Sequence, residues 1–268
     1  MVTNKLSTTK VDDYPVVIVF DLDETLGYFS EFSLLWNYLL SNQIKPISGI
    51  HLQFCFNDFF DKFPELLRPL IVDILKSLLR KKHHHRFEIM LYTNNNGNKM
   101  WVNHIVKYLE YKINKDFQIV ENIFFKIIYA FKVNGMRVEP KRTTTDKTFG
   151  DFLSTTNLPD VTQICFIDDT YYPEMDVKNV FYINVEPYVY HFNAIDMYKR
   201  IKQSKYFLKH YHHIDANKMI NFLNDKLNLK TCDIIVNYDK MKHSIEIIDS
   251  KAIWKFLNEF LMEFCCKK

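Results

Sequence analysis

The sequence predicts an α/β fold in which helices flank a parallel sheet, and three observations lead to this prediction. Short apolar runs of five or six residues alternate with stretches of helical spacing. Two of those runs end in adjacent or closely spaced aspartates. The chain has 268 residues, 47% of them hydrophobic, which is enough for one large domain with an appendage.

Five runs are predicted to be strands. Val16–Phe20 is rich in β-branched residues, as expected of a strand that is buried on both faces of a parallel sheet. The later runs are Phe87–Tyr92, Ile123–Ile128, Gln163–Ile167 and Asn179–Ile183.

Helical stretches lie between these strands. Pro69–Lys81 repeats apolar residues at a spacing that places them on one helix face. Gly97–Tyr111 follows the second strand, and Thr145–Thr156 precedes the fourth. This alternation predicts a sheet covered by helices on both faces, which is a three-layer arrangement.

An insertion, Gly27–Pro64, separates the first strand from its helix. Leu34–Leu40 is predicted to be helical, and Asp58–Phe63 is a second candidate. We assign residues 1–198 to the main domain, with residues 27–66 as an insertion or flap. This leaves no room for a large cap domain.

Residues 199–268 are predicted to form a mostly helical extension. Ala216–Asn228 and Ser250–Phe264 have amphipathic spacing, and we expect the apolar stripe of the second to pack against the core. Between them, Cys232–Tyr238 and Ile245–Ile248 are predicted to form a short hairpin.

Composition favours an intracellular protein, nuclear or cytoplasmic. The five cysteines show neither paired nor metal-binding spacing, as expected of reduced thiols. No apolar run approaches the roughly 18 residues that a membrane-spanning helix requires. A net charge of +3 gives no indication of nucleic-acid binding.

The acidic segment Asp21-Leu22-Asp23-Glu24-Thr25-Leu26 directly follows the first strand. Open α/β sheets bind their ligands at the carboxyl ends of the strands. Two carboxylates at such a place suit a site that holds a divalent cation while one of them attacks phosphorus. An attacking carboxylate and a phosphate are both negatively charged. The repulsion of one such pair of charges 4 Å apart costs about 4 kcal/mol at an effective dielectric constant of about 20. The oxygen-rich residues predict Mg²⁺ as the cation that offsets this repulsion.

Two other strand ends carry polar candidates. Thr93 ends the second strand, where a hydroxyl beside turn amides can bind a phosphate oxygen. Asp168 and Asp169 end the fourth strand and repeat the pattern of the first. A solvated turn or a helix cap would explain each of these alone, but their order along the chain favours a shared site.

These motifs resemble those of the haloacid dehalogenase (HAD) superfamily, whose signature is DxDx(T/V). Over residues 14–198 the chain is most similar to the FCP/SCP branch, the phosphatases of the RNA polymerase II C-terminal domain and their NLI-interacting-factor-like relatives. Arg68-Pro69 resembles the Arg-Pro-Gly of that branch, with Leu70 in place of the glycine. The helical insertion departs from the usual β-rich flap. The resemblance implies a HAD-like Rossmannoid fold.

The resemblance also implies roles for these residues. Asp21 would be the nucleophile, and Asp23 the acid and then the base, with Thr25 steadying the loop and supporting the proton of Asp23. Lys147 would neutralise the phosphate, with Lys141 and Arg142 as rivals. A lysine in a first helical turn opposes the helix dipole, which hints at function. The metal set would be Asp21, the carbonyl of Asp23, and Asp169 or Asp168, the other of which would pair with Lys147.

We therefore expect a Mg²⁺-dependent phosphatase that acts through an aspartyl-phosphate. The resemblance implies a phosphorylated protein or peptide as partner, such as phosphoserine in the RNA polymerase II C-terminal domain. Two enzymatic alternatives are a phosphatase for a nucleic-acid end and one for a small metabolite. A basic groove near Asp21 would favour the former, and a lid made from the insertion the latter. A non-catalytic binding module is the remaining alternative.

Overall fold

The computed structural model describes residues 15–117, 122–227 and 235–265. Its centre is a five-stranded sheet in the order β3-β2-β1-β6-β7, with every neighbouring pair parallel. The strands are β1 (Val16–Phe20), β2 (Glu88–Tyr92), β3 (Lys126–Ile128), β6 (Gln163–Asp168) and β7 (Val180–Asn184). The predicted α/β class is confirmed. The third strand was predicted at Ile123–Ile128 but begins at Lys126, so residues 123–125 lie outside it.

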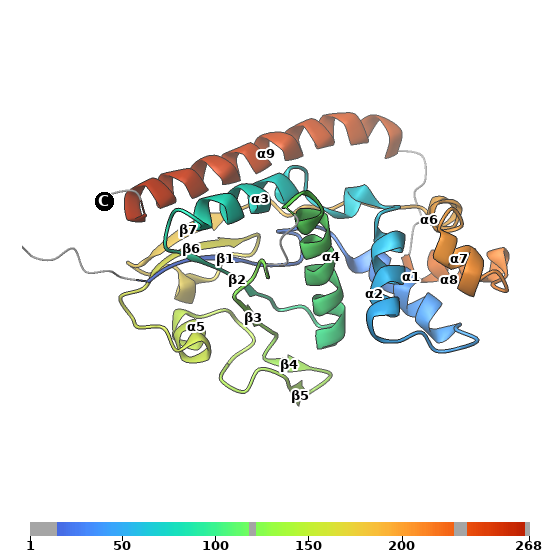
Figure 1. Ribbon diagram of the computed structural model, residues 1–268, viewed down its shortest axis with the longest axis horizontal. Helices are drawn as coiled ribbons and strands as arrows, with labels where there is room; N and C mark the ends of the chain where they lie inside the picture. Colours follow the sequence, from blue (N-terminus) through green and yellow to red (C-terminus); the bar gives the residue numbers. More distant parts are fainter. Residues whose placement is uncertain (1–14, 118–121, 228–234, 266–268) are drawn as a thin grey trace, which may run out of the picture.

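Side chains of successive strand residues point to opposite faces and build two cores. Ile18 and Phe20 of β1 face one core, and Val17 and Val19 face the other. The first core is covered by α3 (Ile71–Lys82), α4 (Lys99–Phe117) and α9 (Ile235–Phe264), and the second by α5 (Phe149–Thr156), which inserts Phe152. The result is the predicted three-layer arrangement, visible in Figure 1.

The insertion is helical, as predicted. It contains α1 (Ser30–Ser41), α2 (Gly49–Phe60) and the short 3₁₀ helix Pro64–Leu66. Phe59 of α2 packs its ring 5.9 Å from that of Tyr211, and Tyr38 of α1 packs 4.8 Å from Phe222. These contacts join the insertion to the C-terminal part of the chain.

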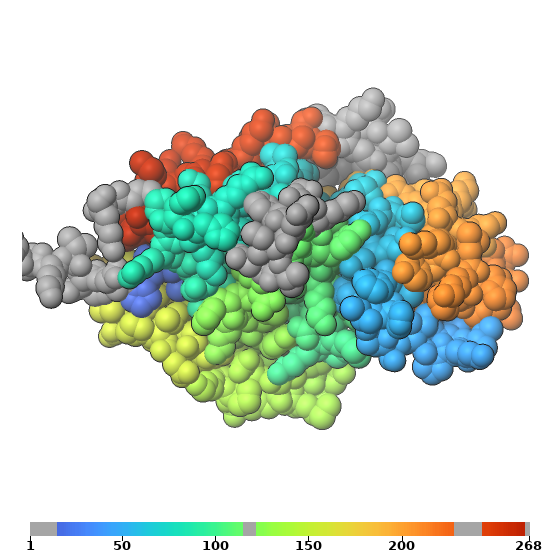
Figure 2. Space-filling view, viewed as in Figure 1, coloured from blue at the N-terminus to red at the C-terminus, as the bar shows by residue number. Residues whose placement is uncertain are grey.

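The partners of the insertion are α6 (Ala194–Ile201), α7 (Lys205–His210) and α8 (Ala216–Leu227). Together with α1 and α2 they form a helical lobe beside the sheet, seen in blue and orange in Figure 2. Helix α6 runs through residue 198, the predicted boundary between domain and extension. The division into domains stays a prediction.

The helix α9 lies over the first core, along α3 (Figure 1). Four residues of its predicted apolar stripe are buried against the core: Ile253, Leu257, Phe260 and Leu261. Phe256 and Phe264, at the edge of the stripe, are exposed. The predicted hairpin is wrong, since residues 235–238 of its first strand and Ile245–Ile248 of its second belong to this helix. Hydrophobic spacing over so few residues fits a helix face as well as a strand. Residues 232–234 lie outside the described residues. Within the described part of the chain, no helix has the length and apolarity to cross a membrane.

A two-stranded antiparallel hairpin, β4 (Lys132–Val133) and β5 (Met136–Arg137), was not predicted. Its turn residues Asn134 and Gly135 have φ values of 50° and 78°. An Asn-Gly pair is favoured where both turn residues need positive φ, so this sequence signal was available.

Leu70 also has a positive φ, of 62°, at the residue before α3. A side chain with a Cβ is strained in this conformation by about 1–2 kcal/mol, whereas glycine is not. We predict that Leu70→Gly is about 0.5–1 kcal/mol more stable than Leu70→Ala in urea denaturation, because both variants lose the partly buried leucine side chain and only glycine relieves the strain. Asp73→Gly and Asp73→Ala are the matched pair inside α3, where glycine should be the less stable of the two. A glycine at position 70 that is no more stable than an alanine there would contradict the strain.

The junction of α2 and α4 contains a buried histidine. Nδ1 of His104 lies 2.5 Å from Oε1 of Gln53, and its ring stacks on Phe56 with centroids 5.0 Å apart. Burial, with a smaller effect of Lys107, lowers the pKa of His104 to about 4. The neutral ring therefore donates its Nδ1–H to the amide oxygen of Gln53.

This histidine predicts a stability that depends on pH. Between its ordinary pKa of about 6.5 and its folded value of about 4, the unfolded chain binds more protons, so stability falls as the pH is lowered. The slope is at most about 1.4 kcal/mol per pH unit. We expect His104→Gln to flatten the unfolding free energy against pH in this window only, with parallel curves above pH 7. An unchanged slope in the variant would contradict the buried neutral histidine.

Candidate active site

The acidic loop follows β1 at the carboxyl edge of the sheet. The backbone N–H of Asp21 donates to the carbonyl of Ile167 (2.9 Å), which fixes the end of β1 beside the end of β6. Glu24 adopts a φ of 61°, and its N–H donates to the carbonyl of Gly27. A Cβ on Gly27 would lie 2.2 Å from the carbonyl oxygen of Leu66, so only glycine fits there. The loop is therefore tightly folded.

The buried side chain of Arg68 binds the backbone of this loop. It is 1% exposed, and its guanidinium donates to the carbonyls of Thr25 (2.7 Å), Glu24 (2.7 Å) and Glu186 (2.6 Å). It also forms an ion pair of 3.3 Å with Glu246 of α9. The C-terminal helix thus contacts the acidic loop through one buried arginine.

Lys147 connects the acidic loop to the end of β6. Its ammonium group is buried, donates to Oδ1 of Asp21 and lies 2.6 Å from Oδ2 of Asp168. Of the rivals, Lys141 is exposed and donates to Asn157, and Arg142 binds backbone carbonyls. Among the described lysines and arginines considered for this position, Lys147 is the one that contacts Asp21.

The loop that carries Lys147 is held by its own buried groups. Arg142 donates to the carbonyls of Thr145 (2.8 Å) and Asp146 (3.0 Å). Its guanidinium also lies over the ring of Tyr92, 4.8 Å from the centroid. Thr148 caps α5 by accepting the N–H of Asp151 (3.0 Å). The prediction that Lys147 lies in the first helical turn is wrong, since it precedes the cap and the helix dipole gives no argument for it.

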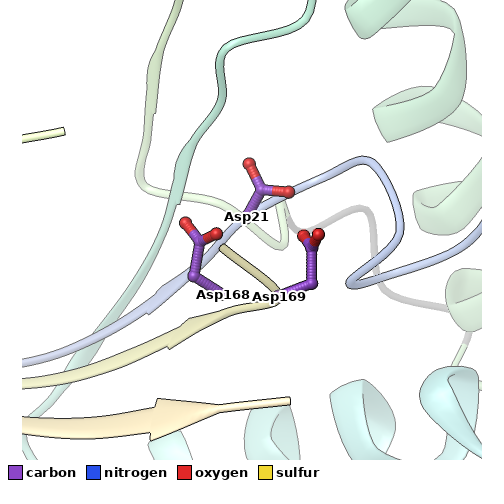
Figure 3. Close-up of side chains that lie close together, drawn as sticks. All are labelled: Asp21, Asp168 and Asp169. Atoms are coloured by element: carbon purple, nitrogen blue, oxygen red, sulfur yellow. The ribbon is translucent and has the colours of Figure 1, made fainter. Parts of the chain in front are cut away.

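Three carboxylates gather where β1 and β6 end. One oxygen each of Asp21, Asp168 and Asp169 lies within 4.8 Å of the others, and Figure 3 shows the three groups side by side. The oxygens of Asp168 accept from Lys147 and from the N–H of Thr170 (2.9 Å). Asp169 accepts from the hydroxyl of Thr25 (3.1 Å). Thr25 therefore supports Asp169, rather than Asp23 as expected.

Asp23 lies at the other side of the acidic loop. Its Oδ2 accepts from the side-chain amide of Asn95 (2.7 Å), a residue of the polar turn after β2. The hydroxyl of Thr93 is buried and accepts the N–H of Asn95 (2.9 Å), so it supports that turn. A role of Thr93 in binding phosphate stays a prediction.

Burial and charge shape the protonation of these groups. Burial would lower the pKa of Lys147, but Asp21 and Asp168 outweigh it and raise that pKa, so the lysine is charged. Burial raises the pKa of Asp21, against the opposing effect of Lys147. Burial, and then the charge of Asp21, raises the pKa of Asp23 to about 7. Asp23 can thus hold a proton near neutral pH.

The donor set fits a magnesium ion. Three carboxyl groups meet one ammonium here, and burial raises the pKa of Asp21 and the pKa of Asp168 despite the nearby Lys147. A bound cation would favour the ionised forms of these groups. One oxygen from each of the three carboxylates lies within 4.8 Å of the others, near enough for a single Mg²⁺ to bind more than one of them. Both oxygens of Asp168 accept hydrogen bonds, one of them from the ammonium of Lys147, whereas those of Asp169 accept from the hydroxyls of Thr25 and Thr170.

Sequence reasoning missed several supporting residues. Asn95, in the turn after β2, was not among the predicted site residues, although its side-chain amide donates to Asp23. Arg142 was considered as a rival for the phosphate and instead orders the loop of Lys147. Glu246 carried no local signal, since its partner Arg68 is 178 residues away in the sequence.

Comparison with known proteins adds little to this geometry. No protein-family model and no curated protein matches the sequence. Among solved structures, the HAD domain of the effector protein Lem4 from Legionella pneumophila, solved as an inactive mutant, is similar. The alignment covers 75% of this chain and 100% of that domain, with 13% sequence identity and a TM-score of 0.38. A likeness of this size says nothing about activity.

The buried pair of Arg68 and Glu246 predicts a large effect on stability. Removing one partner leaves the other charge buried without compensation, which typically costs about 3 kcal/mol or more. We expect Glu246→Ala to lose about 3 kcal/mol of unfolding free energy in urea. Glu259→Ala is the matched control on the same helix, because its pair with Lys255 is exposed and should cost less than about 1 kcal/mol. Equal losses in the two variants would contradict the structural role of the buried pair.

Proposed function

We propose that this protein is a Mg²⁺-dependent phosphomonoesterase that acts through a phosphorylated Asp21. The observation that carries the proposal is the buried contact of Lys147 with both Asp21 and Asp168, beside Asp169. It supports a site where a nucleophile, a compensating cation and metal ligands meet. This is also the chemistry that the resemblance to the HAD superfamily implies.

In the first step, a carboxylate oxygen of Asp21 attacks the phosphorus atom of the substrate. The bond between phosphorus and the leaving oxygen breaks, and Asp23 transfers its proton to that oxygen. The products are an alcohol or a phenol and an acyl phosphate on Asp21. A pKa of about 7 for Asp23 supports this role, since its acid form is present near neutral pH.

In the second step, water attacks the phosphorus atom, and the bond between phosphorus and the carboxylate oxygen of Asp21 breaks. Asp23, now a carboxylate, accepts a proton from this water, so that both aspartates return to their starting forms. Inorganic phosphate is released. Asn95 would hold Asp23 in place during both transfers, because its amide donates to the second oxygen of that carboxylate.

Lys147 would position the nucleophile and pair with a phosphoryl oxygen. Asp21 and Asp169, with the carbonyl of Asp23, would hold Mg²⁺. When bound, the cation would offset the repulsion between carboxylate and phosphate and polarise the phosphoryl oxygens. Asp168 would keep Lys147 in its position.

The resemblance implies that the substrate is a phosphoserine in an extended peptide, and this stays a prediction. One observation favours a compact phosphorylated molecule instead. Residues of α1 form one wall of a cavity that reaches Asp23, so part of the insertion borders the substrate side of that residue. A purely binding role has less support, since Asp21, Asp23, Lys147 and Asp169 are all present.

The proposal predicts phosphate release that depends on both Mg²⁺ and Asp21. We expect the protein to hydrolyse p-nitrophenyl phosphate in Mg²⁺ and to lose this activity in EDTA. Asp21→Asn should lower kcat by roughly 10³-fold or more, because it removes the nucleophile. The reaction is followed by the absorbance of the p-nitrophenolate that it releases.

Asp160→Asn is the control, since Asp160 is an exposed aspartate outside the cluster. It should keep full activity. Release that does not respond to Mg²⁺, or that is equally low in both variants, would overturn the proposal.

A further inference from the structure

A cavity of about 560 Å³ opens beside Asp23 and does not include the three-carboxylate cluster in its lining. Its walls come from α1, from the start of α4 and from the polar turn after β2. Cavities of this size are typical of sites for small ligands. We call it the amide cleft, after the asparagines Asn37, Asn94, Asn95, Asn96 and Asn98 in its lining.

The position of the amide cleft indicates which part of the substrate it would bind. Asp23 is the proposed acid that protonates the leaving oxygen, so the group that carries this oxygen must lie on the side of Asp23. The phosphate itself would lie at Asp21 and Lys147, outside the cleft. The amide cleft therefore faces the leaving group.

Charge restricts what the amide cleft can accept. Among the described residues that line it, none is a lysine or an arginine. His104 lines it too and is neutral at physiological pH, because burial lowers its pKa to about 4. An anionic leaving group would enter this cleft without a partner for its charge, which is costly.

Polar and apolar lining are both available to a neutral group. The side-chain amides of Asn37 and Asn96 are exposed and make no hydrogen bond to other described residues. Each can donate and accept. Leu34 and Met100 add apolar surface, and Met100 is 56% exposed. Such a site suits a group that combines hydrogen-bonding atoms with an apolar body.

We infer that the amide cleft selects phosphate monoesters whose leaving group is compact, free of negative charge and able to hydrogen-bond with amides. The inference rests on the proposed function, and it narrows the substrate class. It excludes nucleic-acid ends and acidic phosphopeptides, because both bring further negative charge to the same cleft.

Two aryl phosphates of matched size test this selectivity. They are 4-carbamoylphenyl phosphate, whose leaving group is neutral, and 4-carboxyphenyl phosphate, whose leaving group is anionic. We expect kcat/KM, normalised to uncatalysed hydrolysis, to be at least about tenfold higher for the carbamoyl compound than for the carboxyl compound. Equal values for these two would overturn the inference.

A charge placed in the amide cleft should change this order. Asn37→Lys supplies a cation to an anionic leaving group, so the ratio of carboxyl to carbamoyl turnover should rise by about tenfold. Asn42→Lys is the matched control, as it adds the same charge just after α1 and outside the cleft lining. It should leave the ratio unchanged. A ratio that moves equally in both variants would count against the cleft as the place of selection.

Product binding separates this inference from the proposed function. The binding of 4-hydroxybenzamide and 4-hydroxybenzoate is measured by calorimetry, which needs no turnover. We expect at least about tenfold tighter binding of the benzamide, and a loss of that preference in Asn37→Lys. If the benzamide binds tighter but no aryl phosphate is hydrolysed, the proposed function fails and the selectivity stands. If both phenols bind equally or not at all, the selectivity fails, whatever the activity.

Discussion

The site depends on one buried ammonium group that lies between two aspartates. Lys147 contacts Asp21 at the end of β1 and Asp168 at the end of β6, where water cannot screen the charges. Two buried carboxylates so close together would repel each other and take up protons without this lysine. With it, Asp21 is oriented, and the remaining negative charge of Asp169 and Asp21 can attract a cation.

This arrangement requires three separate segments of the chain to be held at fixed positions relative to one another. The parallel pairing of β1 and β6 brings Asp21 and Asp168 to the same edge. Arg142 and Asp151 order the loop of Lys147, and Arg68 orders the acidic loop while contacting Glu246 of α9. The C-terminal helix is therefore part of the support of the site, in addition to covering the core.

The strand-end aspartates could be predicted from the sequence because short buried strands place the residues after them at one known edge of a sheet. Asp21 and Asp168 are together for that reason, whereas Lys147 was expected from the resemblance and reaches both from the loop before α5. The contacts of Asn95 and Arg142 could not be predicted, since they depend on how two turns face each other. Glu246 could not be predicted either, because a single glutamate on an amphipathic helix gives no sign of a distant buried arginine. The Ile245–Ile248 hairpin was wrong because short apolar patterns do not distinguish a strand from a helix face.

The most direct measurement is a crystal structure of the protein grown with Mg²⁺ and beryllium trifluoride, which mimics a phosphoryl group on a carboxylate. We expect the fluoride group on Asp21, with the ammonium of Lys147 within hydrogen-bond distance of it and a magnesium ion in contact with Asp21 and Asp169. A fluoride group bound elsewhere, or a cation that leaves these two aspartates uncontacted, would contradict the account.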